Sequence, residues 1–338
     1  MATKVGINGF GRIGRQVLKA ITDRYEGKLE VVGINDLVAG ETNANLLKYD
    51  SNYGRWHRDV RAVEGGLSVD GRVITVFSER DPGAIPWGSV GAEIVIESTG
   101  LFTDATKAVA HKRDSVKKVI ISAPAKNEDV TIVLGVNADK YDPAKHHVVS
   151  NASCTTNGLA PVVKVLVDNL GIVKGQMTTI HSYTNSQQIL DKAAGTDMRE
   201  MRAGPLNIVP TSTGAAKALR LVIPEIDGKL DGLSYRVPTP TVSIVEIVAL
   251  TEKDTTKDAL NDLLRDAAGE QLKGILGFTT DPVVSMDMKG DERSSIVDGL
   301  STNVVGGNLV KVASWYDNEW GYACRISDLC NFLVEKGL

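Results

Sequence analysis

One cysteine stands where a polar segment opens a predicted helix. Cys154 lies within Ser150-Asn151-Ala152-Ser153-Cys154-Thr155-Thr156-Asn157, after a predicted strand at residues 147–150. The apolar positions from Leu159 to Leu170 recur at helical spacing and predict a helix directly behind it. Backbone N–H groups and the positive end of a helix dipole favour thiolate, so we expect a reactive cysteine here. The alternative is a small buried cysteine at a capped helix start.

A histidine ends a second predicted strand. His181 closes the run Met177–Ser182 and precedes a polar, irregular segment at 183–207. Histidine titrates near neutral pH and is the natural base for a thiol. An aldehyde has no good hydride to give until a nucleophile adds to its carbonyl, which a thiolate does well. Cys154 and His181 are therefore the predicted catalytic pair of an aldehyde oxidation.

The other cysteines and histidines favour structural roles. Cys324 and Cys330 fall on a predicted terminal helix with an apolar stripe. The remaining histidines lie in charged stretches or directly before a strand. No Cys and His spacing resembles a metal site. Three cysteines make a sparse, odd set, which favours a reducing, cytoplasmic compartment over a disulfide scaffold.

The length, net charge and composition of the chain argue against several functional classes. The chain has 338 residues, enough for two domains, with a net charge of −4 and a pI of about 5.8. The absence of a basic excess argues against nucleic-acid binding. The sequence starts without an apolar leader and has no apolar run long enough to span a membrane, so we expect no membrane association.

The first residues carry a dinucleotide-binding fingerprint. A short apolar strand, Val5–Asn8, leads into Gly9-Phe10-Gly11-Arg12-Ile13-Gly14, a helix and a second strand, Leu29–Ile34. Glycines at Gly9, Gly11 and Gly14 permit a tight turn and close approach of a pyrophosphate to the helix N-terminus. Asp36 follows the second strand, where a carboxylate binds ribose hydroxyls and disfavours a 2′-phosphate. We therefore predict NAD rather than NADP as cofactor.

The remaining pattern predicts an α/β chain of two parts. The first is a Rossmann-type domain with a mostly parallel sheet, because β-branched strands alternate with helices or loops up to about residue 150. The second has longer strands and fewer helices, as in an α+β catalytic domain with a mixed or antiparallel sheet. Pro161 falls inside the predicted helix behind Cys154, so that helix either bends or starts later.

Anion-binding residue types recur near the predicted catalytic pair. Each of these residues alone would be an ordinary helix cap or surface residue, but together they suit a phosphorylated substrate. They are Ser153, Thr155, Thr184, Thr213, Gly214 and Arg236. Arg80, in the turn-rich loop after residue 77, is either a solvated charge or a neighbour of the adenine.

Over its whole length the chain resembles the phosphorylating glyceraldehyde-3-phosphate dehydrogenase family. The matching stretches are Gly6–Gly14, Ser150–Asn157, His181–Asn185, Pro210–Ala218, Arg236–Pro240 and Ser314–Glu319. The resemblance implies oxidation of D-glyceraldehyde 3-phosphate by NAD through a hemithioacetal and a thioester on Cys154. Inorganic phosphate then releases 1,3-bisphosphoglycerate. His181 would activate the thiol and steady the oxyanion.

The resemblance also implies the remaining contacts and the domain limits. Cofactor contacts carry over to Arg12, Ile13, Asp36, Arg80, Ser122 and Asn318. One phosphate position matches Thr184 and Arg236, and the other matches Ser153, Thr155, Thr213 and Gly214. The domains would be an NAD-binding domain at 1–152, a catalytic domain at 153–318 and a terminal helix at 319–338 packed on the first. The family assembles as a homotetramer, with the loop after His181 at an interface.

Several positions depart from the family pattern. Gly158 stands where a second cysteine is common, Ser186 replaces an Asp, and Thr241 replaces an Asn. Arg199-Glu200 replaces an Arg-Arg pair, so Arg199 or Arg202 is expected to supply the phosphate charge. Two alternatives stay open: an erythrose-4-phosphate dehydrogenase, and a non-catalytic NAD-binding protein of the same fold.

Overall fold

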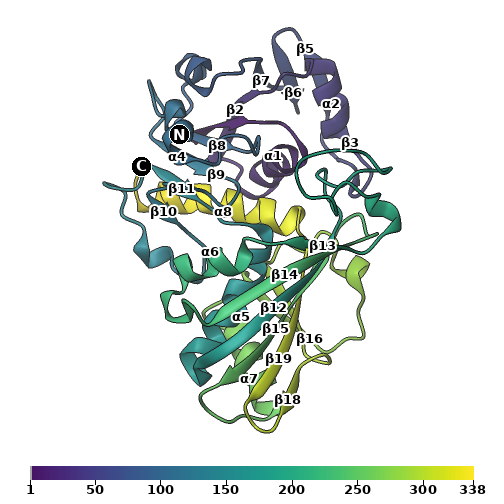
Figure 1. The fold of residues 1–338 in the computed structure, drawn as a ribbon. Helices are drawn as coiled ribbons and strands as arrows, with labels where there is room; N and C mark the ends of the chain where they lie inside the picture. The colour runs from purple at the N-terminus through teal and green to yellow at the C-terminus, as the bar shows by residue number, and fades with distance from the viewer. Residues whose placement is uncertain (1) are drawn as a thin grey trace. The chain divides into compact units, whose positions relative to one another are not determined.

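The computed structural model describes residues 2–338, which form two compact units (Figure 1). The first comprises residues up to Ile132, with Asp139–Ala152 and Ala323–Leu338. The second comprises Val133–Ala138 and Ser153–Tyr322. Within residues 2–338, none of the helices combines the length and apolar character that crossing a membrane requires. The predicted class, a mostly parallel sheet followed by a mixed sheet, is confirmed.

The first unit is built on a nine-stranded sheet in the order β10-β11-β9-β8-β1-β2-β7-β6-β5. All pairs from β10 to β7 are parallel, and β7-β6-β5 pair antiparallel. The bounds are β1 Thr3–Asn8, β2 Leu29–Asn35, β5 Val60–Val63, β6 Gly66–Val69, β7 Arg72–Phe77, β8 Ile94–Glu97, β9 Lys118–Ile121, β10 Val130–Thr131 and β11 Val148–Ser150. A separate two-stranded sheet joins β3 Tyr49–Asp50 and β4 Gly54–Arg55.

Helices cover this sheet because its central strands are apolar on both faces. Every residue of β8 and β9 is buried, as in parallel sheets with helices on each side. The bounds are α1 Arg12–Arg24, α2 Gly40–Lys48, α3 Trp87–Val90, α4 Ala105–Ala108 and the short 3₁₀ turns η1 Pro82–Ala84, η2 Val109–His111 and η3 Ala138–Lys140.

The terminal helix, α8, spans Trp320–Lys336, and its residues from Ala323 onward belong to the first unit. Arg24 Nη1 of α1 donates to the Asp328 carboxylate at 2.6 Å, and the Tyr25 hydroxyl donates to the same oxygen at 2.6 Å. Leu329 and Leu333 are fully buried, each contributing about 1.5–3 kcal/mol of hydrophobic stabilisation. Apolar burial and part-buried polar contacts together therefore hold this helix against α1.

The second unit is built on an eight-stranded mixed sheet, ordered β13-β14-β12-β15-β19-β17-β16 with β18 paired to β19. Strands β12 and β14 are parallel, β16 and β17 are parallel, and the other pairs are antiparallel. The bounds are β12 Ile172–Ser182, β13 Val209–Ser212, β14 Leu230–Val237, β15 Ser243–Thr251, β16 Leu276–Thr279, β17 Ser295–Asp298, β18 Asn303–Val305 and β19 Leu309–Tyr316.

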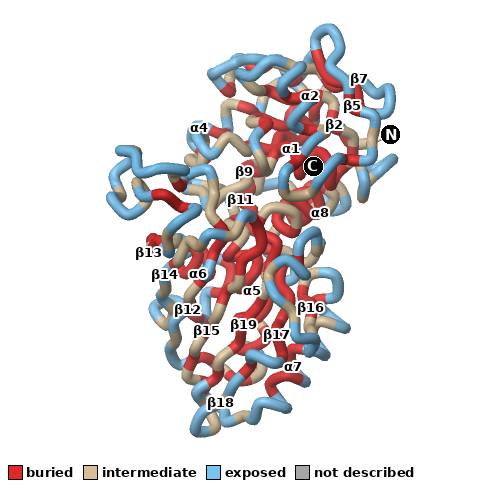
Figure 2. The backbone as a smooth tube through the Cα atoms, turned by 90° about the vertical axis from the view of Figure 1, so that its right-hand side faces the viewer, coloured by how far each residue is buried: buried red, intermediate tan, exposed pale blue. Residues whose placement is uncertain are grey.

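One face of this sheet is covered by helix α5, Cys154–Leu170, which packs on β15, β17 and β19. Figure 2 shows α5 mostly buried, and β15 alternates buried and part-buried residues as a one-sided sheet requires. The helix starts at Cys154, as the position of the polar segment suggested, and Pro161 lies inside it. Because proline has no backbone N–H, α5 lacks one helical hydrogen bond at Pro161. The other helices are α6 Ala215–Val222, α7 Lys257–Gly269 and the turns η4 Gly204–Leu206, η5 Pro224–Ile226 and η6 Ser285–Met288.

Candidate active site

Cys154 is the first residue of α5, and Ser153 caps that helix. The Ser153 Oγ accepts a hydrogen bond from the backbone N–H of Thr156 at 3.0 Å, and its hydroxyl also pairs with the Thr156 hydroxyl at 2.7 Å. Directly before the cap, Ala152 adopts a left-handed backbone with φ of 55°, which costs free energy for a residue with a Cβ. The chain thus turns sharply into the helix at the predicted nucleophile.

His181 is brought to Cys154 by strand β12. Its Nε2 lies 3.5 Å from the Cys154 Sγ, and only 4% of the residue's surface is exposed. Its other ring nitrogen, Nδ1, lies 2.7 Å from the Ser182 carbonyl oxygen and 2.6 Å from Nη1 of Arg236. The parallel register pairs His181 with Arg236 on β14, which accounts for the second contact. The predicted pair is therefore within reach for proton transfer.

Burial governs the charges of this pair. It raises the pKa of the Cys154 thiol, and the nearby Arg236 guanidinium opposes this less strongly. Burial, with the same guanidinium second, lowers the pKa of His181 to about 3. The sequence predicted that the helix start would favour thiolate, whereas burial, the largest effect on the pKa of this thiol, acts in the opposite direction. Burial thus disfavours the charged form of each group.

Tyr316, which is not among the residues predicted from the sequence, contacts two threonine side chains next to the catalytic pair. Its hydroxyl lies 2.9 Å from the Thr155 Oγ1 and 2.9 Å from the Thr179 Oγ1. Thr155, expected to bind phosphate, is buried and has its hydroxyl engaged in this way. Gly158 leaves room for the tyrosine, because a Cβ there would approach the ring to 3.1 Å. Only the long-range pairing of α5, β12 and β19 brings these residues together.

Asn318 is fixed by two buried hydroxyls. Its Oδ1 accepts from the Ser182 Oγ at 2.9 Å and from the Ser243 Oγ at 3.0 Å. This orients the side-chain amide so that Nδ2 is left as the donor. Such a donor suits the carbonyl of a carboxamide, which agrees with the nicotinamide contact expected for this residue.

The residues expected around the phosphate groups fall into two sets. Thr184 contacts the Ser186 hydroxyl at 3.1 Å, and Gln187, missed in the sequence, accepts from the Thr184 backbone at 2.7 Å. Thr213 Oγ1 accepts from the N–H of Ala215 at the start of α6, which Gly214 precedes.

Arg199, Glu200 and Arg202, the residues at and near the position of the family's arginine pair, make contacts away from Cys154 and His181. The Glu200 carboxylate accepts from the Thr211 hydroxyl at 2.6 Å, and Arg202 is paired with Asp191 at 2.7 Å. Arg199 donates through its backbone to Asp197, with no contact to Cys154 or His181 among the described residues. Arg236 is thus the arginine that reaches the catalytic pair.

The glycine turn of the first unit suits a dinucleotide. Gly9 has φ of 90°, and a Cβ there would meet the Thr99 backbone at 2.6 Å, so the protein itself requires that glycine. Gly14 is equally required, because its Cβ would lie 2.2 Å from the Gly9 oxygen. A Cβ on Gly11 would meet no protein atom within 4 Å. Its lack of a side chain thus keeps space open beside the start of α1, where a pyrophosphate fits.

Asp36 lies beside this turn at the end of β2. The backbone N–H groups of Phe10 and Val38 donate to its two oxygens, at 2.8 and 2.9 Å. Each oxygen keeps acceptor capacity, so the carboxylate is held ready for ribose hydroxyls. The loop that carries Arg80 is held by Asn35, whose side chain exchanges two hydrogen bonds with the backbone of Glu79, at 2.9 and 2.8 Å.

Three other predicted cofactor contacts lie in the same unit. Arg12 and Ile13 open α1, and the Arg12 guanidinium is paired with Asp50 at 2.7 Å. Ser122 follows β9 and donates its hydroxyl to the Glu97 carbonyl at 3.0 Å. All three lie beyond the carboxyl ends of parallel strands or at the helix that follows, which is where open α/β sheets bind ligands.

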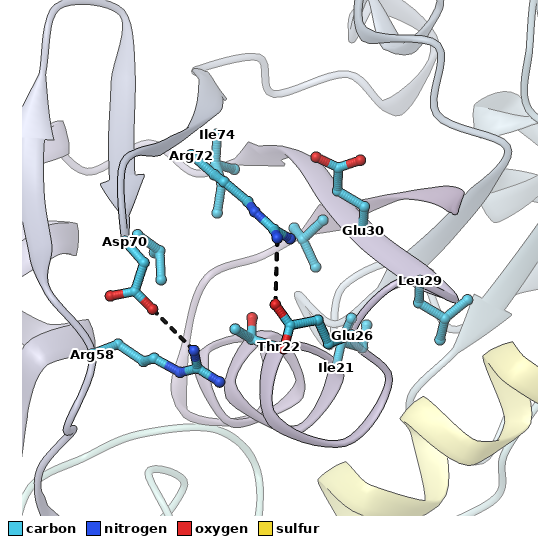
Figure 3. Close-up of a pocket in the computed structure, with 11 residues that line it drawn as sticks. Ile21, Thr22, Glu26, Leu29, Glu30, Arg58, Asp70, Arg72 and Ile74 are labelled. Atoms are coloured by element: carbon cyan, nitrogen blue, oxygen red, sulfur yellow. Dashed lines mark hydrogen bonds and ion pairs between the residues drawn. The ribbon is translucent and has the colours of Figure 1, made fainter. Parts of the chain in front are cut away.

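A small cavity of the first unit, about 170 Å³, contains none of these residues (Figure 3). Its arginines face carboxylates: Arg58 pairs with Asp70 at 3.0 Å and Arg72 with Glu26 at 3.4 Å. The cavity is therefore no part of the site. Among the described residues, no cluster of His, Cys, Asp or Glu could hold a metal ion.

Comparison with known proteins decides the family. A family model described as the NAD-binding domain of glyceraldehyde 3-phosphate dehydrogenase matches residues 3–105, and one for the C-terminal domain matches 153–318. The chain is 55% identical over 338 residues to the glyceraldehyde-3-phosphate dehydrogenase of Geobacillus stearothermophilus, covering 100% of both chains. The chain belongs to the glyceraldehyde-3-phosphate dehydrogenase family.

Further family members show the same full-length similarity. A glyceraldehyde-3-phosphate dehydrogenase of Bacillus subtilis is 54% identical over 338 residues, covering 100% of both chains. One of Streptomyces coelicolor is 53% identical over 334 residues, covering 98% of this chain and 99% of its own. The resemblance inferred from sequence motifs is confirmed, and the first unit holds the NAD-binding domain of the family.

Proposed function

We propose that this chain oxidises D-glyceraldehyde 3-phosphate with NAD and inorganic phosphate, giving 1,3-bisphosphoglycerate. The observation that carries the proposal is the 3.5 Å separation of Cys154 Sγ and His181 Nε2, in a chain with full-length family similarity. The erythrose alternative is not favoured, because the relatives described above are named for the triose phosphate.

Cys154 is the nucleophile of the proposed reaction. Its sulfur adds to the aldehyde carbon, and its own backbone N–H, at the start of α5, stabilises the oxygen that becomes negative. His181 receives the thiol proton, gives it to the oxyanion so that the hemithioacetal carries a hydroxyl, and then takes the hydroxyl proton as the hydride leaves. When bound, NAD accepts the hydride from the same carbon. Inorganic phosphate then attacks the thioester, and the acyl phosphate leaves while the Cys154 thiol is restored.

The first unit offers most of the proposed cofactor contacts. Gly9, Gly11 and Gly14 with the start of α1 suit the pyrophosphate, and Asp36 suits the adenosine ribose. Arg12, Ile13, Arg80 and Ser122 are the further contacts proposed for this unit. Asn318 would donate Nδ2 to the nicotinamide carboxamide, since Ser182 and Ser243 fix its Oδ1 as acceptor.

Two anion positions are proposed around Cys154. The substrate phosphate would bind the Thr184 hydroxyl and the Arg236 guanidinium, and Arg199 is the further cation of this region. Inorganic phosphate would bind Ser153, Thr155, Thr213 and Gly214. Because the hydroxyl of Thr155 contacts Tyr316, its proposed contribution is its backbone N–H near the start of α5.

A homotetramer in the cytoplasm completes the proposal. The segment between β12 and β13 exposes large apolar side chains that a lone chain would leave in water: Ile189, Leu190, Met198, Leu206 and Ile208. A second copy of the chain is the proposed cover. The three cysteines are free, which suits a reducing compartment. Light scattering of the purified protein should give the mass of four chains.

Absorbance of the reduced nicotinamide tests the activity. With D-glyceraldehyde 3-phosphate and NAD, continuous turnover should require inorganic phosphate, because the thioester otherwise accumulates. Turnover with D-erythrose 4-phosphate should be much slower. A chain that binds NAD and reduces none with either aldehyde would support the non-catalytic alternative instead.

A further inference from the structure

A row of buried polar side chains crosses the carboxyl ends of three parallel strands in the first unit. Asn8 ends β1, and the register pairs it with Asn35 at the end of β2 and with Glu97 at the end of β8. His111 of the turn η2, with none of its surface exposed, adjoins the row through Glu97. Open α/β sheets bind their ligands at this edge. The row therefore lies where it can shape the cofactor site without belonging to the predicted contacts.

Trp87 fixes the protonation of His111 at one end of this row. Its indole N–H can only donate, and it lies 3.1 Å from the His111 Nδ1. Nδ1 is therefore the acceptor, and a ring with an accepting Nδ1 is a neutral imidazole that carries its proton on Nε2. This Nε2 lies 3.0 Å from the Glu97 Oε2. His111 thus donates to the Glu97 carboxylate as a neutral ring.

The backbone of Glu79 fixes the direction of hydrogen bonding at the other end. Its N–H donates to the Asn35 Oδ1 at 2.8 Å, so the Asn35 Nδ2 is the group that donates to the Asn8 Oδ1, also at 2.8 Å. The Asn8 Nδ2 then faces Glu97 and donates to Oε2 at 2.5 Å. It also lies 3.4 Å from the His111 Nε2, as two donors to one oxygen do. Both ends of the row therefore converge on the same carboxylate oxygen.

Thr99 surrounds the second oxygen of Glu97 with donors. Its backbone N–H donates to Oε1 at 2.8 Å. Its hydroxyl accepts from the Leu101 N–H at 3.0 Å, which leaves the hydroxyl hydrogen to donate to the same Oε1. A proton on the carboxyl group would face no acceptor, so Glu97 is ionised. Within residues 2–338 no lysine or arginine pairs with it, and neutral donors alone stabilise the buried charge.

Glu97 reaches loops on both sides of the dinucleotide turn, because β8 and β7 lie on opposite sides of β1 in the sheet. Through Thr99 it anchors the loop after β8, whose backbone is so close to Gly9 that a Cβ on that glycine would lie 2.6 Å from the Thr99 nitrogen. Through the two asparagines it anchors the backbone of Glu79, next to Arg80 in the loop after β7. One buried charge therefore holds both loops.

We propose that Glu97 is a positioning residue for the adenosine half of NAD, and that His111 is the neutral donor that keeps its charge in place. Glu97 is 2% exposed and acts through the loops that it anchors. Ordering these loops in the free protein lowers the entropy cost of binding the cofactor. This role rests on the proposed function, in which Asp36 and Arg80 contact the cofactor.

Glu97→Gln tests this role with almost no change in shape. The amide places an NH₂ group against neighbours that are all donors, so one of the two loops loses its anchor. Titration calorimetry should show the affinities for NAD and for ADP-ribose, which has no nicotinamide, each falling about tenfold, because a hydrogen bond to a charge is lost. At saturating NAD, kcat should stay within about twofold of wild type. Unchanged affinity for ADP-ribose would overturn the proposal.

Asp328→Asn is the matched control for a general loss of stability. It changes another carboxylate of the first unit, which accepts from Arg24 and Tyr25, both at 2.6 Å. Its melting temperature should fall while its affinity for ADP-ribose matches wild type. An equal loss of affinity in both variants would reduce the effect of Glu97→Gln to destabilisation and sink the positioning role.

His111 offers a second pair of variants if Glu97→Gln does not fold. His111→Gln keeps an amide donor that replaces the Nε2–H group, so its affinity for ADP-ribose should stay within about twofold of wild type. His111→Leu has no donor and should lose affinity about fivefold. Because this side chain is fully buried, neither change touches the cofactor directly. Equal affinities in the two variants would contradict the role of the donor.

Nitrogen-15 NMR of histidine-labelled, ligand-free protein reads the protonation of His111, with His111→Gln identifying its signals. The ring should carry one proton, on Nε2, at neutral pH. A proton on Nδ1, or on both nitrogens, would contradict the direction of hydrogen bonding that Trp87 imposes and overturn the proposal. Absence of turnover with D-glyceraldehyde 3-phosphate would instead refute the proposed function and leave the affinity and NMR readouts intact.

Discussion

The Cys154 Sγ lies 3.5 Å from the His181 Nε2, and this contact joins the first residue of helix α5 to the penultimate residue of strand β12. Both elements belong to the second unit, so the pair is assembled within a single compact core. Burial disfavours the charged form of both groups.

Removal of the nucleophile should separate binding from chemistry. Cys154→Ser should lower turnover at least a thousandfold, because a serine hydroxyl beside His181 ionises far less readily than a thiol. Its affinity for NAD, measured by titration calorimetry, should match wild type. The fully buried Cys330, whose thiol pKa burial raises, should remain unreactive toward iodoacetamide in both proteins. Substantial turnover by the serine variant would contradict a nucleophilic role for Cys154.

The depressed pKa of His181 should make the fold acid-sensitive. Its pKa of about 3 lies below the usual 6.5, so the unfolded chain binds this proton first as the pH falls. The associated stability is complete above about pH 6.5 and declines by about 1.4 kcal/mol per pH unit below it. Between pH 7 and 5, urea unfolding of wild type should lose about 2 kcal/mol relative to His181→Asn, which cannot titrate. Parallel pH profiles for the two proteins would show that His181 titrates normally.

Loss of the Tyr316 hydroxyl should lower both the folding stability and the catalytic rate. Tyr316→Phe leaves the buried hydroxyls of Thr155 and Thr179 without their shared partner, which costs about 1–3 kcal/mol. Because Thr155 follows the nucleophile directly, kcat should fall about tenfold, while KM for NAD should not change. Denaturant unfolding and steady-state kinetics check both effects. A fully stable, fully active variant would mean that water replaces the hydroxyl without loss.

The carboxylate of Asp36 should select NAD. Asp36→Ala removes the acceptor that Phe10 and Val38 hold in place, and KM for NAD should rise about tenfold. The same change removes repulsion toward a 2′-phosphate, so turnover with NADP should improve. Steady-state kinetics with the two cofactors measure the switch. Unaltered preference for NAD in this variant would locate the selection elsewhere.

Two glycines of the dinucleotide turn should respond differently to alanine. Gly11→Ala has an ordinary φ of −71° and open space for its Cβ, so its melting temperature should stay within about two degrees of wild type. Its KM for NAD should rise at least tenfold, because the methyl group enters the cofactor space. Gly9→Ala is the contrast, because φ of 90° and the Thr99 backbone should destabilise it. Normal NAD binding by Gly11→Ala would mean that this space serves something else.

The features that the sequence predicted correctly are those that depend on residues close together in the chain. The strand, glycine turn, helix and acid up to Asp36 identify a dinucleotide fold because each constrains only nearby backbone. Ser153 signals the start of α5 by its capping chemistry, and the position of His181 at a strand end follows from its apolar neighbours. The short strands β5 to β7 and β16 to β18 were missed, because strands of three to six residues carry little periodic signal.

The electrostatics of the site could not be predicted from the sequence. Arg236 reaches His181 only through the register of β14 on β12, 55 residues away in the chain. Tyr316 reaches Thr155 across 161 residues. The thiol pKa depends on how deeply these elements bury the sulfur, so the helix-dipole argument pointed in the wrong direction. Such long-range contacts leave no periodicity in the sequence.

Mass spectrometry of the acylated protein tests the central claim most directly. Wild type is mixed with D-glyceraldehyde 3-phosphate and NAD without inorganic phosphate, quenched in acid and digested. The predicted result is a 3-phosphoglyceroyl group on the peptide that carries Cys154, lost when phosphate is added before the quench. Formation of reduced NAD with Cys154 unmodified, or with the acyl group on Cys324 or Cys330, would contradict the account.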